Sequence, residues 1–108
     1  MKLILAIVNN DDSNHVQDAL VDGGFFVTKM ATSGGFLKKG NTTFMIGVND
    51  DKVDDVIDII NKHAHKRIEK ETTVPAAQMS DLFTPITVDV LVGGATIFVL
   101  DIDRFEKL

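Results

Sequence analysis

The run of six apolar residues at positions 3–8, Leu-Ile-Leu-Ala-Ile-Val, places the strongest constraint on the fold of this chain. A strand of this composition carries hydrophobic side chains on both faces, and such strands are usually buried on both sides. The chain has 108 residues, which suffices for one domain with a modest core. We therefore expect the chain's own helices to cover one face of the sheet and a second copy of the chain to cover the other.

The hydrophobic pattern after this run predicts two helices and further strands. Val16, Ala19 and Leu20 repeat at helical spacing, and Gly23 with Gly24 ends that helix. The second helix has an apolar stripe formed by Val53, Val56, Ile57 and Ile60. The expected caps are Asp11, Asp12 or Ser13 for the first helix and the run Asn49-Asp50-Asp51 for the second. Strands are expected at residues 3–8, 25–31, 43–48 and 86–90, with residues 95–100 as a hairpin partner that extends the sheet.

This order of elements predicts an α+β fold, a ferredoxin-like β-α-β-β-α-β sheet with two helices on one face and one added strand. The chain forms a single domain in this prediction. Residues 67–84 show no convincing periodicity, and a long stretch of this kind inside a small domain is usually functional or disordered. We therefore expect a long flexible loop at about 67–84.

Composition excludes several classes of function. The chain has no cysteine, which fits a cytoplasmic protein without disulfides or thiol chemistry. Its net charge is −5, so the basic face of a DNA-binding or long-RNA-binding protein is not expected. The apolar run at residues 3–8 is too short to cross a membrane and lacks the features of a signal peptide. A small phosphate-bearing ligand remains compatible, because it needs only a local positive concavity.

The segment between the second and third predicted strands has the composition of a ligand-binding loop. Gly34 and Gly35 allow a tight turn whose N–H groups can hold an anion. Phe36 offers a ring for stacking on a base, and Asn41 offers an amide that both donates and accepts hydrogen bonds. A plain hairpin turn is the simpler interpretation of the glycines. The whole combination favours a nucleotide over a sugar or a lipid.

The same region resembles the PII-like cyclic di-AMP receptor proteins of Gram-positive bacteria. The similarity is carried, in order along the chain, by Ala6-Ile7-Val8, Thr28-Lys29, Ala31-Thr32, Gly34-Gly35-Phe36-Leu37, Gly40-Asn41-Thr42-Thr43-Phe44, Gly47-Val48-Asn49-Asp50-Asp51 and Val92-Gly93-Gly94-Ala95-Thr96-Ile97-Phe98-Val99. These pieces cover nearly the whole chain. The resemblance implies a homotrimer with the sheets packed inward and a signal transduction role in the cytoplasm.

The resemblance also implies which residues bind the ligand. The loop residues Gly35, Phe36 and Leu37 would hold cyclic di-AMP with their backbone and ring, and Asn41 would contact adenine. The residues expected to line the same pocket between subunits are Thr28 and Gly47. Binding would order the loop at 67–84 and thereby change the surface shown to a downstream protein. No cofactor and no metal is implied.

One position departs from the pattern of this family. Many relatives carry Arg where this chain has Phe26, so a forked, permanently charged phosphate contact is missing. Lys29 or Lys38 is the candidate substitute. Two other interpretations remain open: a PII-like sensor of ATP or ADP, and a trimeric interaction scaffold whose ligand pocket has decayed.

Other candidate sites have simpler explanations. Gly35 and Gly40 have the spacing of a phosphate-binding P-loop, but Asn41-Thr42 replaces the Lys-Ser/Thr pair and a strand follows instead of a helix. His63 and His65 are two residues apart and do not face one another on a helix, which argues against a metal site. The Asp residues at 50–58 suit a cap and a solvated helix face. No nucleophile–base pair is evident, and we expect no enzyme.

Overall fold

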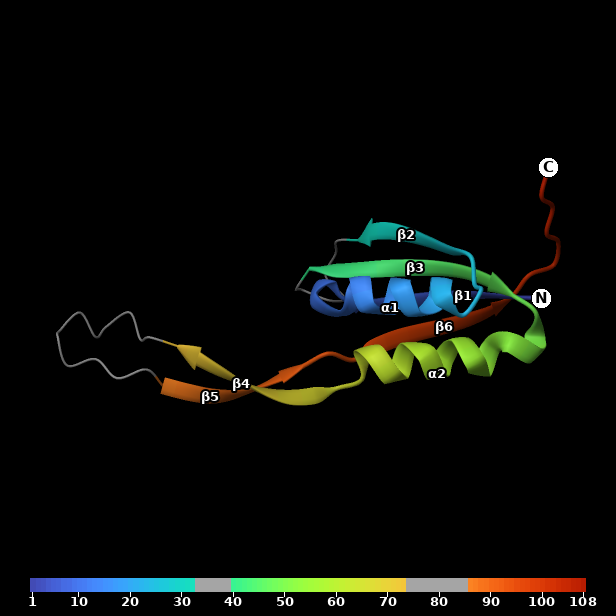
Figure 1. Ribbon diagram of the computed structural model, residues 1–108. Coiled ribbons are helices and arrows are strands. Elements are labelled where there is room, and N and C mark those ends of the chain that lie inside the picture. The colour runs from blue at the N-terminus through green and yellow to red at the C-terminus, as the bar shows by residue number, and fades with distance from the viewer. Residues whose placement is uncertain (33–39, 74–85) are drawn as a thin grey trace.

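The computed structural model describes residues 1–32, 40–73 and 86–108, and the fold below refers to these residues. The elements in chain order are β1 (Lys2–Asn9), α1 (Asn10–Asp22), β2 (Val27–Thr32), β3 (Asn41–Val48), the 3-10 helix η1 (Asp50–Lys52), α2 (Val53–Ala64), β4 (Arg67–Thr73), β5 (Ile86–Val92) and β6 (Ala95–Asp101) (Figure 1). No helix among the described residues is long and apolar enough to span a membrane.

Four strands form the main sheet in the order β2-β3-β1-β6, and all neighbours are antiparallel. Both helices pack on this sheet, α1 against β1, β2 and β3, and α2 against β1 and β6. The order and the two helices confirm the predicted ferredoxin-like α+β fold. The apolar run at residues 3–8 lies within β1, at the centre of the sheet.

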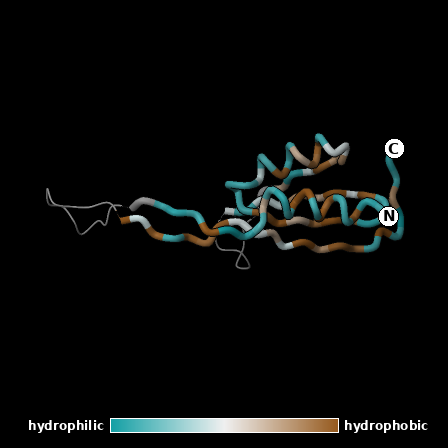
Figure 2. Tube along the Cα trace, turned by 60° about the horizontal axis from the view of Figure 1, so that its bottom comes forward, coloured by the Kyte–Doolittle hydropathy of each residue, from teal (hydrophilic) through white to brown (hydrophobic). Residues whose placement is uncertain are grey.

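The core lies between the sheet and the two helices. Ile4, Ala6 and Val8 alternate along β1 and point to the helices, because side chains on a strand alternate between its faces. Phe44 and Ile46 on β3 lie opposite Ala6 and Ile4 and are also fully buried. The helices contribute Val16, Leu20, Val56, Ile60 and Ala64. In Figure 2 both helices alternate between hydrophilic and hydrophobic residues, as this one-sided burial requires.

Helix α1 ends as its glycines predict. Gly24 has φ of +86°, a left-handed conformation that favours glycine. The Gly24 N–H donates to the Val21 carbonyl, and the Phe25 N–H donates to the Leu20 carbonyl. These two bonds are the Schellman arrangement that closes a helix C-terminus.

The predicted caps are wrong at both helix starts. Helix α1 begins at Asn10, with Asn9 as N-cap and no side-chain capping bond, so Asp12 and Ser13 already lie inside the helix. The one-turn helix η1 occupies Asp50–Lys52, ahead of α2. The Asp50 carboxylate pairs with the amino group of Met1 at 2.8 Å, and this contact lowers the pKa of Asp50. These side chains are therefore recruited by tertiary contacts, which local sequence does not reveal.

The fourth strand of the main sheet differs from the prediction. Strand β6 pairs with β1, whereas β5, predicted to hold that place, pairs with β4 in a separate two-stranded sheet. Gly93 and Gly94 have φ of +80° and +96°, so the chain turns between β5 and β6 without forming a hairpin between them. Residues 86–90 of β5 alternate between apolar and polar, whereas residues 97–100 of β6 are all apolar like the run in β1, and β6 is the strand that pairs with β1.

Strands β4 and β5 form a ribbon that leads away from the main sheet (Figure 1). Residues 67–73 were expected to form the first part of a loop. In the structure they form a strand. Their polar side chains leave no hydrophobic alternation to recognise, because the ribbon is exposed on both faces and has little core to fill. The remainder of the predicted loop, residues 74–84, lies outside the described residues.

The side of the sheet away from the helices is called the open face. Its described residues are Leu3, Leu5, Ile7, Asn9, Thr28, Met30, Asn41, Thr43, Met45, Gly47, Thr96, Phe98 and Leu100, as the strand register and the pleat require. Phe98, Leu100 and Met45 are 48%, 44% and 37% exposed. The two-sided apolar character of β1 thus leaves an apolar surface that no element of the described chain covers.

Candidate functional site

The strand register places three of the six predicted site residues on the open face. Thr28 lies opposite Met45, Gly47 lies opposite Leu3, and Asn41 is the first residue of β3. Thr28 and Gly47 are exposed, whereas Asn41 is 8% exposed. The other three predicted residues, Gly35, Phe36 and Leu37, lie in residues 33–39, outside the described residues.

Thr28 and Gly47 lie together, and Asn41 lies apart from them. Gly47 lies six positions after Asn41 on β3, a distance of about 20 Å along an extended strand. Thr28 pairs with Met45, only two residues from Gly47 on the same face. The predicted site is therefore divided between the two ends of β3 within one chain.

The end near Gly47 borders a hollow of about 530 Å³ between the β3 terminus and the start of α2. Phe26 lines this hollow and is 86% exposed, and the Lys107 Nζ lies 5.5 Å from the centre of its ring. A lysine at this distance over an aromatic face makes a cation–π contact. The complete lining consists of Met1, Gly23, Gly24, Phe25, Phe26, Gly47, Val48, Asn49, Lys52, Asp55 and Ile59.

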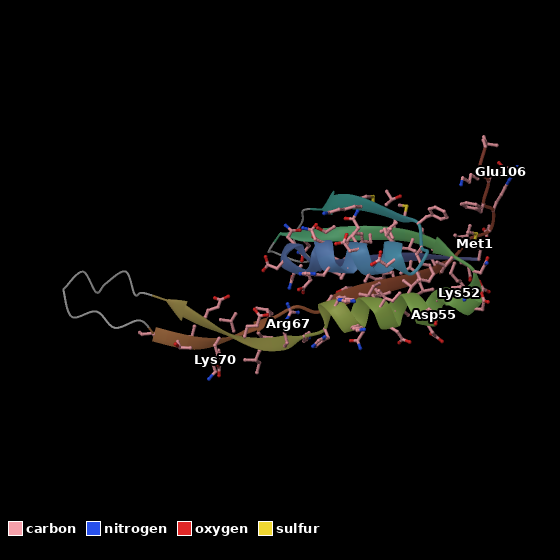
Figure 3. The ribbon with its side chains drawn as sticks, in the orientation of Figure 1. Met1, Lys52, Asp55, Arg67, Lys70 and Glu106 are labelled. Carbon is pink, nitrogen blue, oxygen red and sulfur yellow. The ribbon has the colours of Figure 1, made fainter. Side chains whose placement is uncertain are left out.

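Charged groups of both signs surround this hollow, as Figure 3 shows for Met1, Lys52 and Asp55. The Lys52 ammonium lies 3.8 Å from the Asp55 carboxylate, one turn along the helix. A β-carbon at Gly47 would meet only the Met1 Cε at 3.7 Å, an ordinary contact, so space in this chain alone does not require glycine there. An exposed ring, nearby cations and a bare stretch of backbone suit a flat anionic molecule.

The structure also tests the proposed substitutes for the missing arginine. Lys29 lies opposite Phe44, so it belongs to the helix side of the sheet and not to the open face. Lys38 lies outside the described residues. Sequence reasoning missed Lys107, because nothing local connects it to Phe26, which is 81 positions earlier in the chain.

The end near Asn41 is built from three segments that meet at the start of α1. The Asn10 N–H donates to the Gly40 carbonyl at 3.2 Å, and Thr42 Oγ1 donates to Asn10 Oδ1 at 2.8 Å. A β-carbon at Gly40 would lie 2.5 Å from Asn10 Nδ2, so glycine permits this close approach. Asn10 therefore bonds to both chain neighbours of Asn41, Gly40 just before β3 and Thr42 within it.

The same turn of α1 holds the ribbon. Arg67, the first residue of β4, donates from Nη2 to Asp12 Oδ1 at 2.7 Å and from Nη1 to Asp12 Oδ2 at 3.3 Å. The Asp12 side chain is only 5% exposed. Hydrogen bonds to Asp12, and secondly to Glu69, raise the pKa of the Arg67 guanidinium, so Arg67 stays charged at any physiological pH. Sequence reasoning took Asp12 for a cap and did not consider Arg67.

The alternative sites have structural explanations. His65 is the C-cap of α2, with Nδ1 3.1 Å from the Asn61 carbonyl oxygen. In residues 1–32, 40–73 and 86–108, no cluster of three or more potential side-chain ligands is arranged to hold a metal ion. Asp54, Asp55 and Asp58 lie exposed on α2.

Comparison with known proteins adds two findings. The chain matches the family model described as "cyclic-di-AMP receptor" over residues 1–108, its whole length. It is also similar to a crystal structure of a functionally unknown protein from Pediococcus pentosaceus ATCC 25745, with 43% sequence identity and a TM-score of 0.76. That alignment covers 99% of this chain and 96% of the other.

Proposed function

This chain belongs to the cyclic-di-AMP receptor family, whose ligand is cyclic di-AMP, and we propose that it binds this ligand in a pocket completed between the subunits of a homotrimer. The proposed role is that of a cytoplasmic signal receptor and not of an enzyme. Ligand binding orders loops, above all the remainder of the predicted loop at 74–84, and changes the surface offered to a downstream protein.

The observation that carries this proposal is the division of the expected site along β3. Thr28 and Gly47 share the open face with Asn41 but lie farther along the strand. At ~3.4 Å per residue, Gly47 is about 20 Å from Asn41 along β3, and Thr28, opposite Met45, is about 14 Å from it. A ligand touching all three in one subunit would have to lie along an apolar strand face. A pocket between subunits removes this requirement, because the Asn41 end of one chain can meet the Gly47 end of another.

The open face itself favours assembly. Its apolar side chains, Phe98, Leu100 and Met45 among them, are a third to a half exposed in the single chain. Soluble monomers rarely leave a contiguous apolar sheet face open to water, and a closed ring of identical copies covers it without new surface. Three copies is the number that the resemblance to PII-like proteins implies.

Each expected residue has a distinct task in this proposal. The Thr28 hydroxyl donates to a phosphate oxygen, and the absent side chain of Gly47 lets the ligand approach the backbone. Asn41 reads the adenine edge, and the loop Gly35-Phe36-Leu37 holds the base by backbone contacts and ring stacking. These contacts involve no metal and no cofactor.

The test is a calorimetric titration of the protein with cyclic di-AMP, cyclic di-GMP, ATP and AMP. We expect cyclic di-AMP to bind most tightly and Asn41→Ala to weaken it by about tenfold, the effect of ~1.4 kcal/mol. Thr28→Val should also weaken it, whereas Thr87→Val, the same change at an exposed position of β5, should not. Equal binding of cyclic di-GMP, or no heat with cyclic di-AMP, would remove the proposal.

The same titration tests the two alternative functions. Tighter binding of ATP would indicate a PII-like sensor of ATP or ADP. A scaffold with a decayed pocket would bind none of the four nucleotides, and one observation favours it: position 26 presents an exposed phenyl ring instead of a cation. If Phe26→Arg creates binding where the natural chain has none, the pocket has decayed at this position.

A further inference from the structure

We propose that Asp12 and Arg67 form a joint that links the nucleotide end of β3 to the β4–β5 ribbon, and that ligand bound at Asn41 acts on the ribbon through this joint. The inference rests on the proposed function for the identity of the ligand. The joint itself follows from contacts in the chain.

The first link connects β3 to helix α1. Asn10 accepts the Thr42 hydroxyl at 2.8 Å, and its own N–H donates to Gly40 at 3.2 Å. These two contacts surround Asn41, and Thr42 is only 4% exposed. A ligand that moves Asn41 must therefore shift the start of α1 or break hydrogen bonds that water does not readily replace.

The second link connects helix α1 to the ribbon. Ser13 Oγ donates to the Asn10 carbonyl at 2.9 Å, so Asn10 and Asp12 belong to one hydrogen-bonded helical turn. The carboxylate of Asp12 then receives both terminal nitrogens of Arg67. A forked pair of this kind fixes the orientation of its partners as well as their distance.

The third link fixes the root of the ribbon. Arg67 Nη1 also donates to the His65 carbonyl at 3.2 Å, and Arg67 lies opposite Val92 on β5. A β-carbon at Gly93 would lie 2.4 Å from that carbonyl and 2.6 Å from Arg67 Nη1. The guanidinium thus sits between α1 and both strands of the ribbon, at the position labelled in Figure 3.

A two-stranded ribbon has little stability of its own. Its direction relative to the sheet must come from the contacts at its root, among them the pair of Arg67 with the buried carboxylate of Asp12. Arg67 is therefore a positioning residue for the ribbon, and the network has the contiguity through which a site can act on a distant element.

The experiment measures amide hydrogen exchange in residues 86–92 of the full-length protein, with and without saturating cyclic di-AMP. In the natural chain the ligand should change exchange there on the order of fivefold or more, as for typical coupled sites. Arg67→Met should abolish this change while calorimetry still shows bound ligand. Lys70→Met, which removes an exposed cation of the same ribbon, should leave the change intact.

Two further variants keep the proposal decidable. If Arg67→Met fails to fold because a buried carboxylate is left unpaired, Asp12→Asn combined with Arg67→Met removes both charges. In the free protein, Thr42→Val should speed exchange in the ribbon of the natural chain and add nothing in the Arg67→Met background. Additive effects, or full transmission of the ligand effect without Arg67, would refute the joint. If cyclic di-AMP does not bind at all, only the proposed function is refuted. The effect of Thr42→Val on ribbon exchange in the free protein, with and without Arg67→Met, would still test the joint.

Discussion

Replacing Phe98 by Asp should separate the proposed trimer into folded single chains. Phe98 lies on β6, opposite Leu5, and is 48% exposed on the open face. A phenylalanine side chain that is fully buried removes about 150–250 Å² of surface from water. Because Phe98 is about half exposed, contact with another subunit would bury roughly 100 Å² more of it. At about 25 cal/mol per Å² this area contributes about 2.5 kcal/mol per subunit.

The effect on assembly multiplies because each subunit loses the same contact. Three such losses would lower the association constant of the trimer by about five orders of magnitude, at ~1.4 kcal/mol for each factor of ten. A carboxylate placed between subunits adds its own desolvation cost. The assembly should therefore be lost at micromolar concentration, while the core beneath β1 and the helices stays intact.

The assay is light scattering combined with sedimentation equilibrium, with circular dichroism to check folding. The natural chain should have about three times its 11.8 kDa mass, and Phe98→Asp should have the mass of one chain. The control is Val21→Asp, because Val21 is 56% exposed on α1 and lies outside the open face. A single-chain mass for the natural protein, or a trimeric mass for Phe98→Asp, would refute the reasoning.

Three further predictions concern stability. Phe44→Ala should lower the free energy of unfolding in urea by about 3–5 kcal/mol, because Phe44 is fully buried under both helices; a loss below 1 kcal/mol would place the core elsewhere. Gly93→Ala should destabilise the fold by more than the ~1 kcal/mol that an unstrained Gly→Ala change can add, since its φ is +80° and its β-carbon would strike the His65 carbonyl; an unchanged melting temperature would contradict the turn geometry. The lowered pKa of Asp50 stabilises the fold above the ordinary carboxyl pKa, and this contribution is lost as pH falls through the lowered value, so acetylation of the Met1 amino group should raise the Asp50 pKa in an NMR titration.

Much of the fold could be predicted because its signals are local. Gly23 and Gly24 end α1 where expected, since a left-handed residue is a property of the backbone at that point. The stripe of Val56 and Ile60 on α2 is buried as its spacing requires. The unbroken apolar run of β1 predicted a buried strand, and β1 lies at the centre of the sheet.

The strand ends and the partner of β1 were less predictable. Asn41 and Thr42 belong to β3, although polar residues beside a glycine-rich segment are typical of a loop. They join the sheet because they pair with Asn9 and Val8 of β1, and Thr42 also bonds to Asn10, 32 positions earlier in the chain. Strand β6, and not β5, pairs with β1, and the turn at Gly93 and Gly94 lies between these two strands.

For the candidate site too, the residue types could be chosen from the sequence, but their arrangement in space could not. The choice of Thr28, Asn41 and Gly47 came from residue type and from resemblance, and their ligand contacts stay a prediction. That they share one face yet lie at opposite ends of β3 follows only from the pairing register. The cation beside Phe26 comes from Lys107, a neighbour in space that no local pattern connects to it.

The helices and the central strand could be predicted from the sequence alone, because hydrophobic periodicity and glycine conformations act within a few residues. Only the tertiary structure decided that Asp12 binds Arg67 and that Asp50 binds the amino group of Met1. A charged side chain can pair with any opposite charge that the fold brings within a few ångströms. The partner is therefore settled by the packing of helices on the sheet, and not by the residues beside it in the chain.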